Sequence, residues 1–160
     1  MREARWLSPS EQHTWRAYLQ ASQQLLAQLD RELEQDAGMP FAYYQMLVVL
    51  SEAPDRTLRM SELAARTWSS RSRLSHAVDR LAERGWVERT SCASDKRGAF
   101  AMLTETGFAV LVIAAPKHVE SVRRHLFDRL TPEEVQLLDA ISSKIAEGSR
   151  GADAASAGTP

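Results

Sequence analysis

The chain has 160 residues, 44% of them hydrophobic, which is enough to bury one core but hardly two. No run of eighteen apolar residues occurs, and the N-terminal MREARW precedes no apolar stretch, so we expect neither a membrane-spanning helix nor a secretory signal. Because Cys92 is the single cysteine, no intrachain disulfide can form, and we expect a protein of the reducing cytoplasm.

The net charge of −1 hides an uneven distribution of charged residues. From Arg56 to Arg97, ten Arg and Lys residues stand against five Asp and Glu, a net charge of +5, whereas the rest of the chain carries −6. A basic segment between acidic segments is typical of a protein in which the basic segment binds DNA and the acidic segments do not contact it. The alternative is a solvated surface whose charges are merely uneven.

A long helix is predicted at the N-terminus. The segment 8–11, Ser-Pro-Ser-Glu, is a capping box with proline at the first helical position, and Gly38 with Pro40 ends the helix. Its apolar residues recur every three or four positions. They are Trp15, Leu19, Leu26, Leu29 and Leu33. So long a helix has little of its own chain to pack against, which predicts a partner subunit.

Two helices joined by a tight turn are predicted in the basic segment. A helix over 41–51 and a short strand over 58–60 come first. The next helix spans 61–67, with Ser61 as its cap, and the last one runs from the turn at 68–70 to about residue 84. Gly85 then ends it, since glycine readily adopts φ > 0. We expect Trp68 and Trp86 to clamp this last helix onto the domain.

The helix that ends at Gly85 has two distinct faces. Its apolar stripe consists of Leu74, Ala77, Val78 and Leu81. The opposite face is polar and basic, and such residues bind base edges and phosphates in the major groove, while the helix N-terminus attracts phosphate. The predicted DNA-binding residues here are Ser69, Ser70, Arg71, Ser72, Arg73, Ser75, His76 and Arg80.

A charged hairpin is predicted next, with strands over 86–90 and 99–103 and a loop over 91–98.

The sequence resembles the MarR family of winged-helix transcriptional regulators. Two segments carry the resemblance, SELAARTWSSRSRLSHAVDRLAERGWVER and SDKRGAFAMLTETG. The family's wing usually carries an acidic residue two positions before an arginine, and Asp95 and Arg97 match. The resemblance implies that Arg97 enters the minor groove, that Asp95 orients it, and that Lys96 also lies at the DNA.

Two further helices are predicted after the hairpin. Thr104 would cap the first, which reaches Arg129, and a second capping box over 131–134 opens the last helix, which reaches residue 147. The apolar stripe of the first is Phe108, Leu111, Val112, Ala115, Val119, Val122 and Leu126. Residues 148–160 are mostly Gly, Ala and Ser, and we expect a disordered tail there. The resemblance implies that helices 8–37 and 104–147 interlock with a second copy, so we expect a homodimer.

The sequence predicts neither an enzyme nor a metal or cofactor site. It contains no glycine-rich phosphate loop, HExxH motif or nucleophile elbow. His118 and His125 lie seven residues apart and could share a metal with a carboxylate, but two solvated histidines are the simpler interpretation. Cys92 could sense oxidants, although the family's peroxide-sensing cysteine lies near the first helix and a packing role is favoured here.

Aromatic residues gather on the first two predicted helices, near the cleft of MarR-like dimers. A pocket with such walls would bind a small aromatic or phenolic effector, although plain core packing is the alternative. The residues are Trp15, Tyr18, Phe41, Tyr43 and Tyr44.

The predicted fold is mainly α with a small antiparallel β wing: a winged helix-turn-helix over 41–103 plus N- and C-terminal dimerisation helices. The predicted function is sequence-specific binding of double-stranded DNA at an inverted repeat, as a repressor that an effector releases by reshaping the dimer. The alternative is a winged-helix module that binds proteins instead of DNA, but such a module has no reason to keep the arginines beside the serine row.

Overall fold

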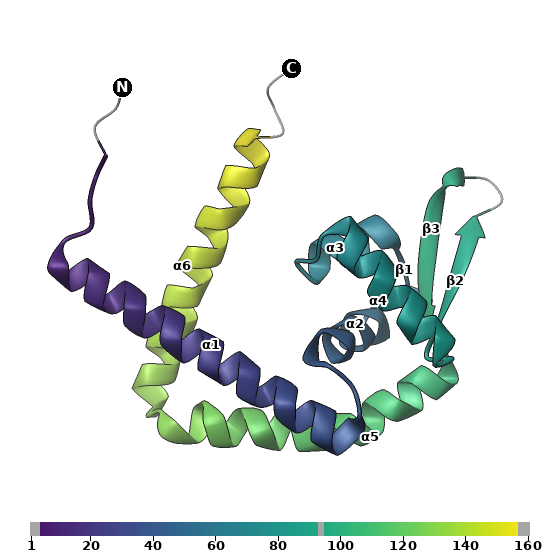
Figure 1. The fold of residues 1–160 in the computed structure, drawn as a ribbon, viewed down its shortest axis with the longest axis horizontal. Helices are drawn as coiled ribbons and strands as arrows, with labels where there is room; N and C mark the ends of the chain where they lie inside the picture. The colour runs from purple at the N-terminus through teal and green to yellow at the C-terminus, as the bar shows by residue number, and fades with distance from the viewer. Residues whose placement is uncertain (1–3, 93–94, 157–160) are drawn as a thin grey trace. The chain divides into compact units, whose positions relative to one another are not determined.

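The computed structural model describes the backbone of residues 4–92 and 95–156, and the side chains of residues 4–90 and 99–148. Helices dominate this part of the chain, and a three-stranded antiparallel sheet accompanies them (Figure 1). The predicted fold class is therefore confirmed. The chain forms two compact units, Met1–Ser121 and Val122–Pro160.

The first helix, α1, spans Pro9–Ala37, and the predicted capping box opens it. The Ser8 amide donates to Glu11 Oε2 at 2.7 Å, while the Glu11 amide donates to Ser8 Oγ at 3.2 Å. Gly38, at φ 62°, ends the helix as expected. Leu29 and Leu33 are buried, but Trp15 is 51% exposed. The C-terminal half of α1 therefore holds its buried residues, whereas Trp15 lies exposed in its N-terminal half.

The second helix, α2 (Phe41–Ser51), leads into a 3-10 turn and the short strand β1 (Thr57–Arg59). Helix α3 then spans Met60–Arg66. The predicted cap at Ser61 is wrong, because α3 begins one residue earlier and its N-cap, Arg59, makes no side-chain capping bond. The strand runs directly into the helix, so Ser61 already lies within the first turn.

Helix α4 spans Arg71–Glu83 and is held at both ends. Ser70 Oγ accepts a hydrogen bond from the Arg73 amide at 3.3 Å, so Ser70, one of the two expected candidates, is the N-cap. Gly85 follows the helix at φ 70°, as predicted. The Arg84 guanidinium donates to the Gly38 carbonyl at 2.9 Å and lies 4.9 Å from the Trp86 ring centre. The hydrogen bond to Gly38 ties the end of α4 to the end of α1.

The sheet has the strand order β1-β3-β2, with β2 over Val87–Cys92 and β3 over Asp95–Leu103. Both strands extend further than predicted, so Asp95, Lys96 and Arg97 lie in β3 and not in a loop. The antiparallel ladder continues from Thr90 to Cys92 through a register shift that accommodates the extra residues. Residues 93–94, where the hairpin turns, lie outside the described residues.

Helix α5 spans Glu105–His125 and is followed by a 3-10 turn over Phe127–Arg129. Thr104 caps it, as expected, because its Oγ1 accepts from the Gly107 amide at 3.0 Å. The predicted apolar stripe is wrong in part, since Val112 and Val119 are 53% and 54% exposed. The buried face carries Leu111 of the predicted stripe together with Gly107, Ala114 and Ser121.

Gly107 explains which face of α5 turns inward. A Cβ built on Gly107 would lie 2.1 Å from the Trp86 carbonyl oxygen, so only glycine allows the helix to come this close to the start of the hairpin. This contact joins residues that lie 21 positions apart in the sequence, so the apolar pattern of α5 alone does not predict it.

The last helix, α6, spans Pro132–Ser156. Its capping box is present, because the Thr131 amide donates to Glu134 Oε2 at 2.8 Å and the Glu134 amide donates to Thr131 Oγ1 at 3.3 Å. The helix continues past residue 147, where we expected it to end and a disordered tail over 148–160 to begin.

The core of the first unit lies between α4, α2, α3 and the sheet. Its fully buried large side chains are Met39, Leu47, Leu50, Leu63, Leu74, Val78, Leu81 and Val87. Burial of each contributes about 1.5–3 kcal/mol relative to exposure, so α4 is fixed firmly by its apolar stripe. Its opposite face is left for solvent or a partner.

Candidate nucleic-acid interface

The exposed face of α4 matches the predicted DNA-binding set closely. Ser70, Arg71, Ser72, Arg73, His76 and Arg80 are exposed, whereas Ser69 and Ser75 are half-buried. The buried stripe of Leu74, Val78 and Leu81 lies on the other side. All eight predicted residues therefore lie on or beside the outer face of one helix.

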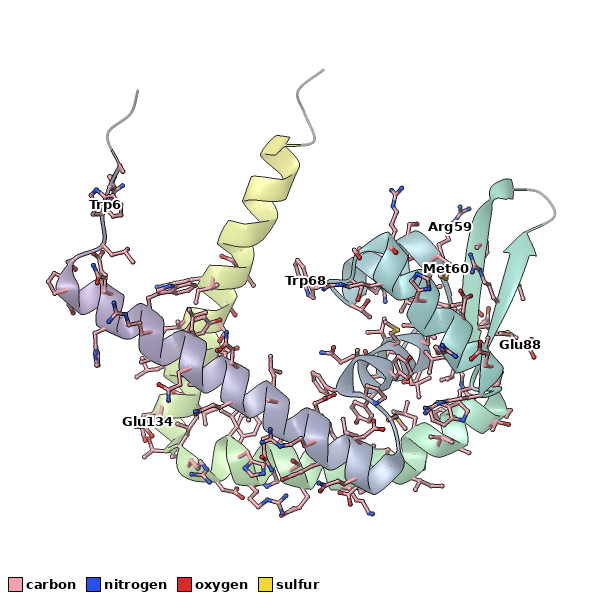
Figure 2. All side chains as sticks on the ribbon, in the orientation of Figure 1. Trp6, Arg59, Met60, Trp68, Glu88 and Glu134 are labelled. Carbon is pink, nitrogen blue, oxygen red and sulfur yellow. The ribbon has the colours of Figure 1, made fainter. Side chains whose placement is uncertain are left out.

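The two serines before α4 shape the turn that precedes it. Ser70 Oγ is occupied by capping, and Ser69 Oγ donates to the Thr67 carbonyl at 3.3 Å. Trp68 adopts φ 52°, a conformation that costs a bulky residue about 1–3 kcal/mol. It is 72% exposed and points out of the turn (Figure 2), so the expected clamping of α4 by Trp68 is wrong. Trp86 does pack against the core.

The arginines of α4 differ in their partners. Arg80 Nη1 lies 2.9 Å from Glu83 Oε2, and this hydrogen bond raises the pKa of Arg80 further. No ion pair joins Arg71 or Arg73 within the part of the chain whose side chains are described. Both lie in the first turn, where the helix dipole adds positive potential. The start of α4 is therefore the strongest anion-attracting part of the helix.

A groove of about 370 Å³ lies beside this helix start, between α4, β1 and the hairpin. Its lining residues are Arg59, Met60, Ser61, Arg71, Leu74, Ser75, Arg89 and Ala99. Arg59 and Arg89 did not belong to the predicted set. Strand alternation could have revealed Arg89, because it follows the buried Val87 by two residues and so lies on the helix-facing side of β2.

The wing residues Asp95, Lys96 and Arg97 lie in β3, but their side chains lie outside the described part of the chain. Their predicted roles at the minor groove stay predictions. The same holds for Cys92 at the end of β2.

The aromatic residues predicted to line an effector pocket fall into three places. Phe41 and Tyr44 line a pocket of about 270 Å³ with His118. The His118 ring centre lies 5.6 Å from that of Phe41 and 4.4 Å from that of Tyr44. Trp15 and Tyr18 stack on each other along α1, and Tyr43 lies beside Arg84, so none of these three lines the pocket.

The pocket beside Phe41 combines apolar walls with a few polar groups. Its remaining lining residues are Gln45, Val48, Val49, Arg66, Thr67 and Trp68. Burial lowers the pKa of His118 and raises that of Tyr44, because both charged forms lose hydration. His118 Nδ1 is buried and has no hydrogen-bond partner among the described residues.

Known proteins provide independent evidence of the family. The sequence pattern of the MarR family matches residues 37–98, which contain α2 to the start of β3. Sco3205, a MarR family transcriptional regulator from Streptomyces coelicolor solved in complex with DNA, is 53% identical with a TM-score of 0.88, and the match covers 92% of each chain. The chain belongs to the MarR family.

Two further relatives agree with this placement in the MarR family. AbsC, also a MarR family regulator from Streptomyces coelicolor, is 44% identical with a TM-score of 0.85, over 92% of this chain and 99% of AbsC. The transcriptional repressor MprA of Escherichia coli K12 is 28% identical over 109 residues, or 68% of this chain. The chain spans 61% of the length of MprA. These MarR-family relatives are transcriptional regulators, and the family is not one of enzymes.

In this MarR-family chain, no group of three or more His, Cys, Asp or Glu residues in the described part could hold a metal ion. His118, one of the two histidines considered as metal ligands, packs instead against aromatic rings. No helix among the described residues is long and apolar enough to cross a membrane.

Proposed function

We propose that the chain binds double-stranded DNA sequence-specifically and represses transcription in the cytoplasm. The observation that carries this proposal is the exposed start of α4, where Arg71 and Arg73 lie without ion pairs among the described side chains, beside a groove that Arg59 and Arg89 also line. Guanidinium groups at a helix N-terminus match the base edges and phosphates of a major groove. The DNA complex of the relative Sco3205 supports the same function.

The proposed active form is a homodimer. Large apolar side chains remain exposed in the N-terminal half of α1, among them Trp15 and Leu26. Others lie on α6, namely Leu137, Leu138 and Ile141. Contact with a second copy would remove these side chains from water. Two copies related by a two-fold axis would bind an inverted repeat whose half-sites lie about 10 bp apart.

The proposed effector is a small aromatic or phenolic molecule that binds beside Phe41, Tyr44 and His118. The pocket of about 270 Å³ is large enough for a single ring, and Arg66 offers a cation at its edge. The effector would lower DNA affinity by favouring a dimer in which the two α4 helices no longer match two major grooves.

Selection of bound fragments from random duplex DNA tests this function directly. We expect the selected fragments to share an inverted repeat, and a scrambled version of that repeat to bind weakly. A selection that enriches no sequence, with equally weak binding to every duplex, would contradict DNA recognition. It would favour the alternative of a winged-helix module that binds proteins.

A further inference from the structure

Two carboxylates, Asp79 and Glu83, are exposed on α4, and Glu83 pairs with Arg80 at the end of the helix. Asp79 is half exposed and shares the outer face of α4 with Ser72, Arg73 and His76. A carboxylate that faces the phosphates of DNA repels them and weakens binding. A helix that binds DNA gains nothing from such a residue unless the carboxylate holds another group in place.

That other group is Arg89 of β2. Its Nη1 lies 3.0 Å from Asp79 Oδ1 and 3.4 Å from Ser75 Oγ. The two acceptors are one helical turn apart on α4, so a single guanidinium joins the recognition helix to the wing strand. An ion pair this exposed contributes little to folding stability. Its effect is therefore to fix the position of Arg89 relative to α4.

The guanidinium held in this way reaches the groove beside α4. Arg89 lines it together with Arg59 and Arg71, and Figure 2 shows Arg59 beside Met60 on this side of the sheet. These three cations come from three different elements, β2, β1 and α4. Among the described side chains, Arg89 bonds Asp79 and Ser75 through Nη1, while a guanidinium has five N–H donors. A phosphate group, with its oxygens in a compact array, is the anion that such donors bind best.

On the basis of the proposed function, we propose that Arg89 is a phosphate-binding residue of the DNA interface and that Asp79 is its positioning residue. The groove receives one backbone phosphate of the duplex between the recognition helix and the wing. Asp79 thereby strengthens DNA binding although its own charge is repelled by DNA.

Two substitutions separate this role from simple electrostatics. Arg89→Gln removes the phosphate contact and weakens binding about tenfold on all duplexes. It also reduces the slope of log affinity against log salt by about one per protomer. Asp79→Asn removes a negative charge, so electrostatics alone predicts tighter binding. The positioning role predicts binding about threefold weaker.

The ion pair between Arg123 and Asp128 offers matched controls. Its two atoms lie 3.5 Å apart, both side chains are exposed, and both lie outside the winged part. Arg123→Gln and Asp128→Asn change the net charge as the test variants do, and we expect both to keep the parent's affinity.

Conservative substitutions at the two proposed residues give a further test. Arg89→Lys keeps the positive charge but lacks the planar set of N–H donors of a guanidinium, so it should keep the salt slope but recover only part of the affinity. Asp79→Glu should restore most of the binding.

The measurement is the affinity of each variant for the selected repeat and for its scrambled version at several salt concentrations. Thermal unfolding of each variant checks that it is folded. The inference is overturned if Asp79→Asn binds more tightly than the parent, or if Arg89→Gln keeps the parent's affinity and salt slope. A parent that fails to distinguish the repeat from the scrambled duplex overturns the proposed function itself, and this inference with it.

Discussion

Arg73 and Arg80 both lie exposed on α4, yet their surroundings give them different capacities to bind DNA. Arg80 already has Glu83 as a partner at 2.9 Å, whereas Arg73 lies in the first turn with no ion pair among the described side chains. A guanidinium that must leave a carboxylate gains less from a new anion than one that is surrounded by water.

We expect Arg73→Ala to cost about 1–3 kcal/mol of DNA-binding free energy and to relax the base preference at one position of the site. Arg80→Ala should cost less, because Glu83 already satisfies that cation. Binding of both variants to a panel of single-base operator changes measures the difference. Equal losses that spread evenly over all base positions would show that Arg73 contacts phosphate only.

We expect the buried ring of His118 to make the stability of the fold depend on pH. Burial lowers the pKa of His118, so the folded state holds its proton less tightly than the unfolded state does. Stability is therefore complete above the ordinary histidine pKa of about 6.5 and decreases as the pH falls towards the folded value. We expect the free energy of unfolding to decrease between pH 7.5 and 5.5, and His118→Phe to remove part of this decrease. Denaturant titrations at both pH values measure it. If the parent and the variant showed the same pH dependence, His118 would not be a cause of the loss of stability at low pH.

At the scale of the elements, local signals predicted several helix ends, whereas the predicted cap at Ser61 and the predicted end of α6 at residue 147 were wrong. The capping boxes at Ser8 and Thr131 and the positive φ of Gly85 depend on neighbours within a few residues, and all three are present. The buried face of α5 depends on a contact between distant segments, Gly107 and Trp86, and it differs from prediction. The start of β3 also differs, because its pairing with β2 continues as far as Cys92 and Asp95.

In the candidate site, too, features set by local sequence could be predicted, and features set by contacts in the folded chain could not. The polar face of α4 could be predicted because helical periodicity determines it, and most of the predicted residues are exposed, although Ser75 is half-buried. Strand alternation places Arg89 on the helix-facing side of β2, but its contact with Asp79 could not be predicted, because that contact depends on how closely β2 approaches α4. The effector pocket was predicted from aromatic composition, and only Phe41 and Tyr44 of the five residues line one cavity.

Gly107→Ala tests the close approach of α5 to the hairpin. The added Cβ would overlap the Trp86 carbonyl, which lies 2.1 Å away, so we expect a loss of about 1–3 kcal/mol in the free energy of unfolding. Gly148→Ala is the matched control, because nothing lies within 4 Å of its Cβ in α6. It should stabilise the helix by about 0.5–1 kcal/mol. Equal effects of the two changes in denaturant titrations would show that α5 has room at Gly107.

At the scale of the whole molecule, each of the two compact units carries part of the proposed function. Met1–Ser121 contains α4, the groove that Arg59, Arg71 and Arg89 line, and the pocket beside His118. Val122–Pro160 contains α6, whose exposed apolar residues favour association with a second copy. DNA binding by two copies requires both properties.

We expect the chain to be a dimer at micromolar concentration in the absence of DNA, because the exposed apolar residues of α1 and α6 lose contact with water on association. Sedimentation velocity measures the mass in solution. Leu137→Glu together with Ile141→Glu places charges on α6 and should shift the population towards monomer, while Glu133→Gln in the first turn should not. A parent that sediments as a monomer would contradict the proposed assembly.

Footprinting on the selected site is the most direct test of DNA recognition by two copies of α4. We expect two protected half-sites, related by inverted symmetry and centred about 10 bp apart, because both recognition helices must enter the major groove on one side of the duplex. Protection should disappear on the scrambled duplex, and Arg73→Ala should weaken it in both halves alike. Protection of a single half-site, or equal protection of the scrambled duplex, would contradict this account.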